Sequence, residues 1–150
     1  MRRSSCVAVI LLLGLGIIPA KLSAQQPGGS TSGNRGAPSK LRQNYPNPFN
    51  PKTRIPFDLN ADDVAKNGGA RVTIRIYNVL QQLVAYPVAE NYPGGAKPAV
   101  NSLSYTDAGS YTAYWDGNDR NGQQVASGLY YIQLIVNGRS GGIQKALVGK

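Results

Sequence analysis

The stretch DGNDRNG, residues 116–122, brings several potential metal ligands close together along the chain. Its side-chain oxygens belong to Asp116, Asn118, Asp119 and Asn121. Carboxylate and amide oxygens are the ligands that Ca²⁺ prefers, so these residues are calcium candidates. An EF-hand loop would have an acidic or amide side chain at position 120 and a glutamate further on, whereas this chain has Arg120. The same residue types accept hydrogen bonds from backbone amides in tight turns, and we favour this interpretation.

The residue types that perform most acid–base and nucleophilic catalysis are scarce. The sequence has no histidine, and its one cysteine, Cys6, lies near the N-terminus. The acidic residues are Asp58, Asp62, Asp63, Glu90, Asp107, Asp116 and Asp119. Asp62 and Asp63 are adjacent, but a solvated turn explains them more simply than a catalytic pair. Without the common bases, nucleophiles and zinc ligands, the sequence predicts a protein that is not an enzyme and uses no cofactor.

Residues 1–24 are predicted to be an export signal. Arg2 and Arg3 precede an apolar run from Cys6 to Ala20, and Ala24 is a small residue at the predicted cleavage site. The run is too short for a membrane-spanning helix, which needs roughly 20 apolar residues. We therefore expect a Sec-type signal that is removed, with no membrane span afterwards. The expected location is the cell surface or the extracellular space, with the periplasm as an alternative.

Removal of this signal leaves a basic chain that cannot form a disulfide. The cut takes the only cysteine and three of the 16 Lys and Arg residues, and the seven acidic residues then leave a net charge of +6. The remaining basic residues are scattered singly along the sequence. Such a surface attracts acidic polysaccharides, lipid headgroups and nucleic acid without specificity. We expect an ordinary solvated surface and no nucleic-acid partner.

The composition divides the rest of the chain into a linker and one domain. Residues 25–40 are rich in Gly, Ser and Pro and lack large apolar side chains, which predicts a flexible linker. Residues 41–150 suffice for a single domain. Only NADDVAK, residues 60–66, offers a helical turn. Residues 86–104 form a long connection, which we interpret as either a binding surface or a disordered insertion.

The apolar pattern of residues 41–150 has a period of two, which indicates strands. Val72, Ile74 and Ile76 fall on one face of a predicted strand. Tyr111, Ala113 and Trp115 fall on one face of a second predicted strand. Residues 128–138 are apolar on both faces, which predicts a central strand, and residues 143–150 predict a short final strand. Clusters of Gly and Asn separate these runs. The pattern predicts an all-β fold, an immunoglobulin-like (fibronectin III-like) antiparallel β-sandwich of about seven strands.

The segment NYPNPFNP, residues 44–51, precedes the first long strand. Its prolines fix φ and hold the residues before them extended, which predicts a rigid arm. We expect Tyr45 and Phe49 to insert into the edge of the sandwich. Gly128 is expected to let the backbone pass close to a neighbour, under Trp115.

These segments also carry a family resemblance. NYPNPFNP at 44–51, VTIRIYNVLQQLV at 72–84 and WDGNDRNGQQVASGLYYIQL at 115–134, with a lysine-bearing final strand, resemble the C-terminal sorting domains of the type IX secretion route. They also resemble the immunoglobulin-like domain of the flagellar hook-capping protein FlgD. The resemblance covers residues 41–150. The family usually has glycine where Gln81 stands, so this turn is expected to differ or to be strained.

The resemblance assigns a structural role to the motif residues. They are Tyr45, Pro46, Asn47, Pro48, Phe49, Asn50, Pro51, Trp115, Asp116, Gly117, Asp119, Gly122, Val125, Ser127, Gly128 and Tyr130. The resemblance also implies a sorting and cell-surface attachment module that the outer-membrane secretion apparatus recognises. The expected sorting strand comprises Gln144, Lys145, Ala146, Leu147, Val148, Gly149 and Lys150.

Two alternatives remain for the function. The first is a free-standing extracytoplasmic binding or scaffold protein that contacts another envelope protein through loops or sheet edges. The second is a flagellar hook-cap module, which we disfavour because hook-capping proteins leave by the flagellar route and need no cleavable signal.

Overall fold

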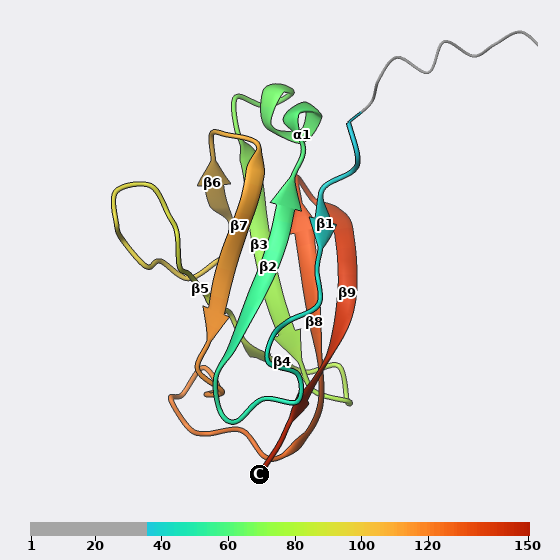
Figure 1. Cartoon of the computed structure of the whole chain (residues 1–150), viewed down its shortest axis with the longest axis vertical. Helices are drawn as coiled ribbons and strands as arrows, with labels where there is room; N and C mark the ends of the chain where they lie inside the picture. Colours follow the sequence, from blue (N-terminus) through green and yellow to red (C-terminus); the bar gives the residue numbers. More distant parts are fainter. Residues whose placement is uncertain (1–35) are drawn as a thin grey trace, which may run out of the picture. The chain divides into compact units, whose positions relative to one another are not determined.

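A computed structural model describes residues 36–150 of the chain. The predicted signal peptide and most of the predicted linker, residues 25–35, lie outside the described residues. Within them the chain forms nine strands and one short helix (Figure 1). The elements are β1 (Lys40–Leu41), β2 (Thr53–Leu59), α1 (Ala61–Ala65), β3 (Ala70–Tyr77), β4 (Leu83–Ala85), β5 (Val88–Ala89), β6 (Leu103–Tyr105), β7 (Gly109–Trp115), β8 (Gly128–Val136) and β9 (Arg139–Val148). The predicted all-β class is confirmed, and β1 and β5 are too short to give a periodic signal.

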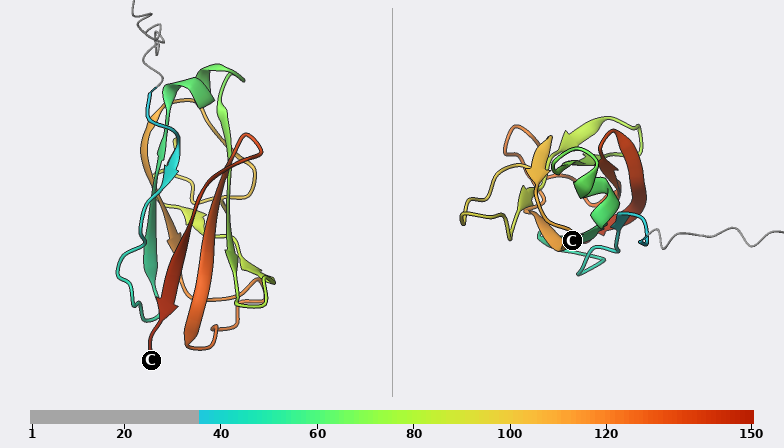
Figure 2. Two further views of the ribbon diagram at one scale, coloured as in Figure 1. Left: turned by 90° about the vertical axis from the view of Figure 1, so that its right-hand side faces the viewer. Right: turned by 90° about the horizontal axis from the view of Figure 1, so that it is seen from above.

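The strands form two antiparallel sheets that face each other across one core, as the side and end views show (Figure 2). The β2/β7 sheet has the order β1-β2-β7-β5, and the β3/β8 sheet has the order β4-β3-β8-β9 with β6 also paired to β3. β1 begins at Lys40, one residue before the predicted start of the domain. β9 is the last strand of the chain and forms one edge of the β3/β8 sheet.

The alternation seen in the sequence decides which side chains enter the core. Val72, Ile74 and Ile76 of β3 are buried, and Arg71 and Arg75 lie on the opposite face. β8 pairs with β3 on one side and with β9 on the other, so its predicted central position is confirmed. The apolar outer face of β8 is half-buried rather than covered, which leaves Tyr131 and Ile135 at the surface of the β3/β8 sheet.

Aromatic side chains fill the core at both ends. The Trp115 ring is buried and lies 5.3 Å from the Phe49 ring and 5.6 Å from the Tyr130 ring. The Trp115 Nε1 donates to the carbonyl of Asn118 at 2.8 Å, so its polar atom is satisfied. A second cluster surrounds Tyr105, whose pKa is raised because burial disfavours the phenolate.

The one helix is a single short turn at the residues where the sequence allowed it. Asn60 is its N-cap, and the Asn60 side chain accepts a hydrogen bond from the Asp63 amide at 2.7 Å. In the part of the chain that the structure describes, no helix is long and apolar enough to cross a membrane.

Candidate functional site

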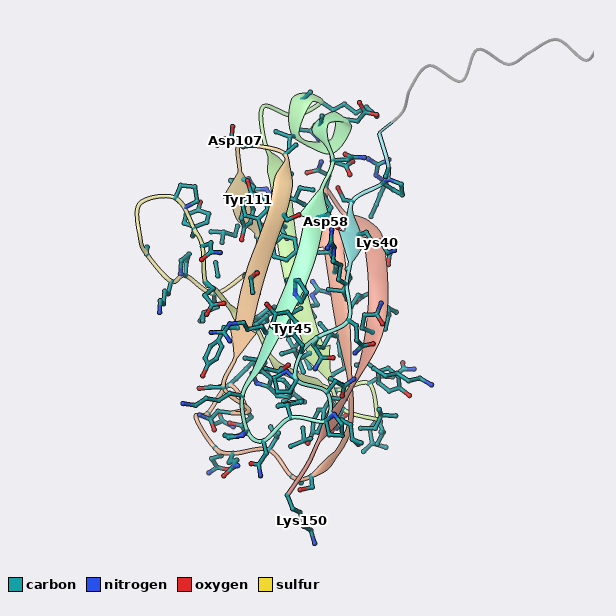
Figure 3. The ribbon with its side chains drawn as sticks, viewed as in Figure 1. Lys40, Tyr45, Asp58, Asp107, Tyr111 and Lys150 are labelled. Atoms are coloured by element: carbon teal, nitrogen blue, oxygen red, sulfur yellow. The ribbon has the colours of Figure 1, made fainter. Side chains whose placement is uncertain are left out.

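The proline arm, residues 44–51, lies against the end of β9 rather than beside an empty sheet edge. Phe49 is 1% exposed, and its amide donates to the Leu147 carbonyl at 2.9 Å. The Gly149 amide donates back to the Phe49 carbonyl at 2.8 Å. The expected insertion is therefore confirmed for Phe49. It is wrong for Tyr45, which is 51% exposed beside β2 because the arm turns its side chain outward (Figure 3).

Amide side chains complete the contact between the arm and β9. The Asn47 Oδ1 accepts from the Leu147 amide at 2.8 Å, and the Asn47 Nδ2 donates to the Lys145 carbonyl at 3.0 Å. Gln43, just before the arm, donates to the same carbonyl at 3.1 Å. Backbone groups of residues 145–149 on this edge of β9 are thus already hydrogen-bonded. A partner strand could not add to this edge without displacing the arm.

A small buried polar network fixes the bend of the arm. The Asn44 side chain is buried and donates to the Thr53 Oγ1 at 3.0 Å and to the Pro46 carbonyl at 3.3 Å. The Thr53 hydroxyl also donates to the Pro46 carbonyl at 3.0 Å. Because the buried polar groups find partners within the network, the bend is specified by hydrogen bonds as well as by proline geometry.

The expected sorting strand divides between core and surface. β9 runs for 10 residues, so the closing strand is longer than the short one predicted. Ala146 and Val148 are buried in the core, whereas Lys145 is exposed and Leu147 is 43% exposed. Gln144 is half-buried, and Gly149 and Lys150 follow the end of the strand. Only the outward face of β9 is therefore available for recognition without unfolding the edge.

The outward face of β9 continues across the β3/β8 sheet. The strand register places Tyr77, Tyr131 and Lys145 in one row, and Arg75, Gln133 and Ile143 in the next. A hollow of about 610 Å³ opens on this face. It is lined by Tyr77, Val79, Gln81, Tyr131, Gln133 and Ile143. The hollow lies between the turn after β3 and the strands β8 and β9.

The turn after β3, residues 78–82, forms one wall of the hollow. The Asn78 Oδ1 accepts from the amides of Leu80 and Gln82, each at 3.0 Å. Gln81 has φ of 60°, so the glutamine adopts the left-handed conformation that glycine adopts most readily. The strain expected at Gln81 is therefore present, and the Asn78 side chain holds the turn in place.

Side-chain oxygens of the calcium candidates accept hydrogen bonds from backbone amides of the same turn. The Asp116 Oδ1 accepts from the Asn118 amide at 3.0 Å. The Asp119 Oδ1 accepts from the Asn121 amide at 2.8 Å and from the Gln123 amide at 2.9 Å. The hydrogen bond from the Gln123 amide is the main cause that lowers the pKa of Asp119. These contacts favour turn chemistry, and within residues 36–150 no three His, Cys, Asp or Glu side chains come together as a metal site.

The close backbone approach occurs at Gly117 and not at Gly128. Gly117 has φ of 81°, and a Cβ there would collide with the Pro51 carbonyl. Space around Gly128 is open, so the approach expected there is wrong; its φ of 148° is what favours glycine. Pro51 is more than sixty residues away from Gly117 in sequence, so no local pattern could reveal this contact.

The remaining motif residues support the same end of the domain. The Val125 amide donates to the Gly117 carbonyl at 2.9 Å, and the Tyr130 hydroxyl donates to the Ala126 carbonyl at 2.9 Å. The Ser127 hydroxyl reaches the Gly149 carbonyl at 3.3 Å. Gly122 takes a φ of 79° in the turn. Pro46, Pro48 and Asn50 are exposed on the arm.

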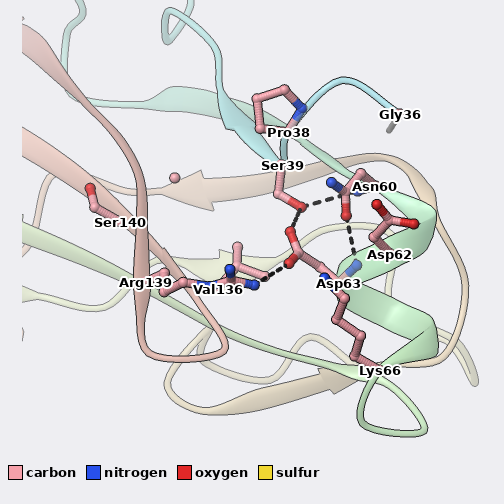
Figure 4. A pocket seen from close by; sticks show the side chains of 11 residues that line it. Gly36, Pro38, Ser39, Asn60, Asp62, Asp63, Lys66, Val136, Arg139 and Ser140 are labelled. Atoms are coloured by element: carbon pink, nitrogen blue, oxygen red, sulfur yellow. Dashed lines mark hydrogen bonds and ion pairs between the residues drawn. The ribbon is translucent and has the colours of Figure 1, made fainter. Parts of the chain in front are cut away.

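A second hollow lies at the α1 end, and several of the residues that line it are hydrogen-bonded to one another (Figure 4). The Asp63 carboxylate accepts from the Ser39 hydroxyl at 2.6 Å and pairs with Arg139 at 2.8 Å. The Asn60 amide donates to the Ser39 Oγ at 3.0 Å. Asp63 thus joins the chain before β1 to the β8–β9 hairpin, and Asp62 lies beside it in α1.

The long connection at 86–104 folds back on the domain. The Ala89 amide donates to the Pro98 carbonyl and the Val100 amide donates to the Pro87 carbonyl, each at 2.8 Å. Val100 is buried, and the Tyr92 hydroxyl donates to the Ser104 carbonyl at 2.9 Å. The segment is therefore tied to the core at both ends, and its tip projects from the side of the domain (Figure 1).

Comparisons with known proteins give one structural likeness. No family model matches the chain, and no curated protein matches it. Among solved structures, the chain is similar to the alkylpurine DNA glycosylase AlkC of Pseudomonas fluorescens bound to DNA containing an abasic site analogue. The identity is 13%, the TM-score is 0.45, and the match covers 77% of this chain and 31% of that chain.

This match contradicts two expectations drawn from the sequence. It is to an enzyme bound to DNA, so the expectations of no enzyme and of no nucleic-acid partner are withdrawn. The residues themselves also leave room for an enzyme and for a nucleic-acid partner. Aspartate, lysine and tyrosine can serve in catalysis without histidine, and basic residues scattered along a sequence can gather on one face of a fold. A TM-score of 0.45 does not indicate that this chain has glycosylase activity or binds DNA.

Proposed function

We propose that residues 41–150 form an immunoglobulin-like (fibronectin III-like) sandwich that acts as a type IX sorting and cell-surface attachment domain. The observation that carries the proposal is the meeting of the motif segments at the final strand. Phe49 packs on Trp115, and Gly117 admits the Pro51 carbonyl. Asn47 bonds to both Lys145 and Leu147 of β9. Two of the three segments behind the family resemblance, 44–51 and 115–134, thus hold β9 in place.

The outward face of β9 is the recognition element in this proposal. The edge near Lys145 and Leu147 is bonded to the arm, whereas the side chains of these two residues point away from the core. A secretion apparatus would therefore read the face of β9 rather than pair with its edge. The domain then travels folded, with the arm in place.

The test is a double variant, Lys145→Ser with Leu147→Ser, expressed in the native host. Deletion of residues 144–150 would remove Ala146 and Val148 from the core, whereas this variant leaves the core intact. We expect the variant to remain in the periplasm while the parent chain crosses the outer membrane. The matched control is Tyr45→Ser, which removes an exposed aromatic beside β2 and is expected to export normally. Normal export of the double variant would contradict the proposal.

A free-standing binding or scaffold protein is the second candidate. The exposed hollow on the β3/β8 sheet favours it, because apolar surface that is left open marks contact sites. In that case the parent chain itself would remain in the periplasm, and Lys145→Ser with Leu147→Ser would not change its location.

A further inference from the structure

Exposed apolar side chains gather on one side of the domain. The large hydrophobic residues that are exposed within residues 36–150 are Tyr45, Val79, Leu80, Ile143 and Leu147. All except Tyr45 belong to the turn after β3 or to the outward face of β9. Val79 is 61% exposed and Leu80 is 73% exposed. Such a concentration of apolar surface is typical of a contact site.

The floor of the hollow is aromatic, and cationic groups lie beside it on the same face of the sheet. Tyr77 and Tyr131 are direct cross-strand partners, and Lys145 lies beyond Tyr131 in the same row. Arg75, in the next row, donates to the Tyr77 hydroxyl at 3.5 Å, and its Nε is buried with no hydrogen-bond partner among the described residues. Tyrosine and arginine are among the residue types that contribute most of the binding energy at protein interfaces. Here both types lie beside exposed aliphatic side chains.

The charge on this face has one sign. None of the outward-facing residues of β3, β8 and β9 is acidic, whereas Arg75 and Lys145 are basic. The carboxylates of Asp58 and Glu90 lie on the β2/β7 sheet, where each pairs with an arginine. Asp63 pairs with Arg139 beside α1. A complementary partner would therefore bring its own carboxylates.

We propose that this hollow is the docking site for a loop of an envelope protein that presents an apolar side chain flanked by acidic residues. The apolar side chain would enter between Val79 and Ile143, and the acidic groups would meet Arg75 and Lys145. A second copy of the chain fits less well, because it would bring like charges together. A bilayer surface fits less well, because a recess cannot lie flush against it.

This inference rests on the proposed function and extends the recognition surface beyond the final strand. Recognition then depends on the turn after β3, which lies more than fifty residues before β9 in sequence. Val79 and Leu80 do not belong to the expected sorting strand, so their replacement separates the hollow from β9 itself.

The experiment compares variants of the full chain in its native host. Val79→Asp with Leu80→Asp replaces an apolar residue that lines the hollow and its exposed apolar neighbour, and it adds charge that repels an acidic partner. We expect the exported fraction to fall about tenfold, as the loss of one interface hot spot would produce. Tyr45→Asp is the control, because it also replaces an exposed apolar side chain by aspartate but in the arm beside β2, and its export should equal that of the parent. Lys145→Glu should also reduce export, whereas Lys145→Arg, which keeps the positive charge, should leave export at the level of the parent.

Each outcome separates the two proposals. Trapping of Lys145→Ser with Leu147→Ser but normal export of Val79→Asp with Leu80→Asp would overturn the hollow and leave the sorting function standing. Normal export of both would remove the sorting function as well. Thermal unfolding of the purified chains shows whether the turn variant is folded, and Val79→Ser with Leu80→Ser replaces it if it is not.

Three binding measurements test the other occupants on purified parent chain. Sedimentation detects a dimer, vesicles of phosphatidylglycerol detect anionic lipid, and a duplex DNA oligonucleotide detects nucleic acid. Any such binding that Val79→Asp with Leu80→Asp abolishes would assign the hollow to that occupant and overturn the proposed protein partner. The absence of all three, together with loss of export, supports it.

Discussion

The outer faces of the two sheets are built differently. On the β2/β7 sheet, Arg42 pairs with Asp58 at 2.6 Å and Arg54 pairs with Glu90 at 3.0 Å. Ser110 also donates to Asp58 at 2.7 Å, so this face satisfies its charges internally. The β3/β8 sheet instead presents Tyr131 and Ile143 beside Arg75 and Lys145, which form no ion pair among the described residues. This difference, between two faces that cover the same core, is the basis for proposing a partner on the β3/β8 face.

The largest effect is expected from Trp115→Ala, because this residue supports both faces at once. Trp115 is buried between Phe49 and Tyr130, and its loss leaves a cavity. We expect the free energy of unfolding to fall by about 3–5 kcal/mol, measured by chemical denaturation. Tyr114→Ala, one residue earlier on the outward side of β7, should cost much less. Equal stability of Trp115→Ala and the parent would show that the two faces do not share this core.

Gly117→Ala tests whether the close contact between the arm and Gly117 is needed to hold β9 and its contact face. The new Cβ would meet the Pro51 carbonyl, so the cost should exceed that of positive φ alone. Gly122→Ala is the matched control, because Gly122 has φ of 79° but open space around it. We expect about 1 kcal/mol for Gly122→Ala and about 1–3 kcal/mol more for Gly117→Ala, measured as free energies of unfolding. Equal costs would mean that the arm does not depend on Gly117.

Asn47→Ala tests whether the face or the edge of β9 is recognised. The change removes hydrogen bonds to the Lys145 carbonyl and from the Leu147 amide, which should cost about 1–3 kcal/mol of stability. Exposed Asn50→Ala serves as the control. Recognition by the face predicts that export per folded molecule is unchanged. Export that rises in Asn47→Ala would instead indicate that a partner pairs with the freed edge.

The smallest effect is a pH dependence confined to the β2/β7 face. Burial raises the pKa of Asp58, but the hydrogen bonds from Arg42 and Ser110 lower it by more. The pKa of Asp58 therefore lies below the ordinary value of 3.8. A carboxyl with a lowered pKa stabilises the fold above 3.8 and loses that contribution as the pH falls through its folded value.

Thermal unfolding of Asp58→Asn against the parent checks this pH dependence. The parent should be the more stable chain near neutral pH, and the difference should vanish in acid. Lys145→Ser, on the β3/β8 face, should show no such convergence. A difference that persists in acid would mean that Asp58 contributes through packing rather than through its charge.

The sequence predicted the parts of the fold that depend on local pattern. The alternation of Val72, Ile74 and Ile76 identified β3, and the two apolar faces of residues 128–138 identified a central strand. The burial of Trp115 also followed from alternation. Two-residue strands such as β1 and β5 could not be predicted, because they form only when a longer neighbour offers a ladder.

The site depends on contacts that no local pattern records. Tyr45 and Phe49 stand in similar proline-rich surroundings, yet only Phe49 is buried, because the bend between them decides which ring faces the core. The contact from Asn47 to Leu147 spans 100 residues. Val79 and Leu80 continue the apolar pattern of the preceding strand, and only the folded chain shows that both are exposed and that Val79 lines a hollow.

Intact-mass analysis of the parent chain tests the sorting function most directly. The protein would be recovered separately from the periplasm, the outer membrane and the medium of its native host. The proposal predicts a chain that lacks residues 1–24 in the membrane or the medium, either shortened within residues 41–150 or carrying added mass at its C-terminus. A full-length chain from residue 25 to residue 150 that resides only in the periplasm would contradict the sorting function and indicate a binding or scaffold protein.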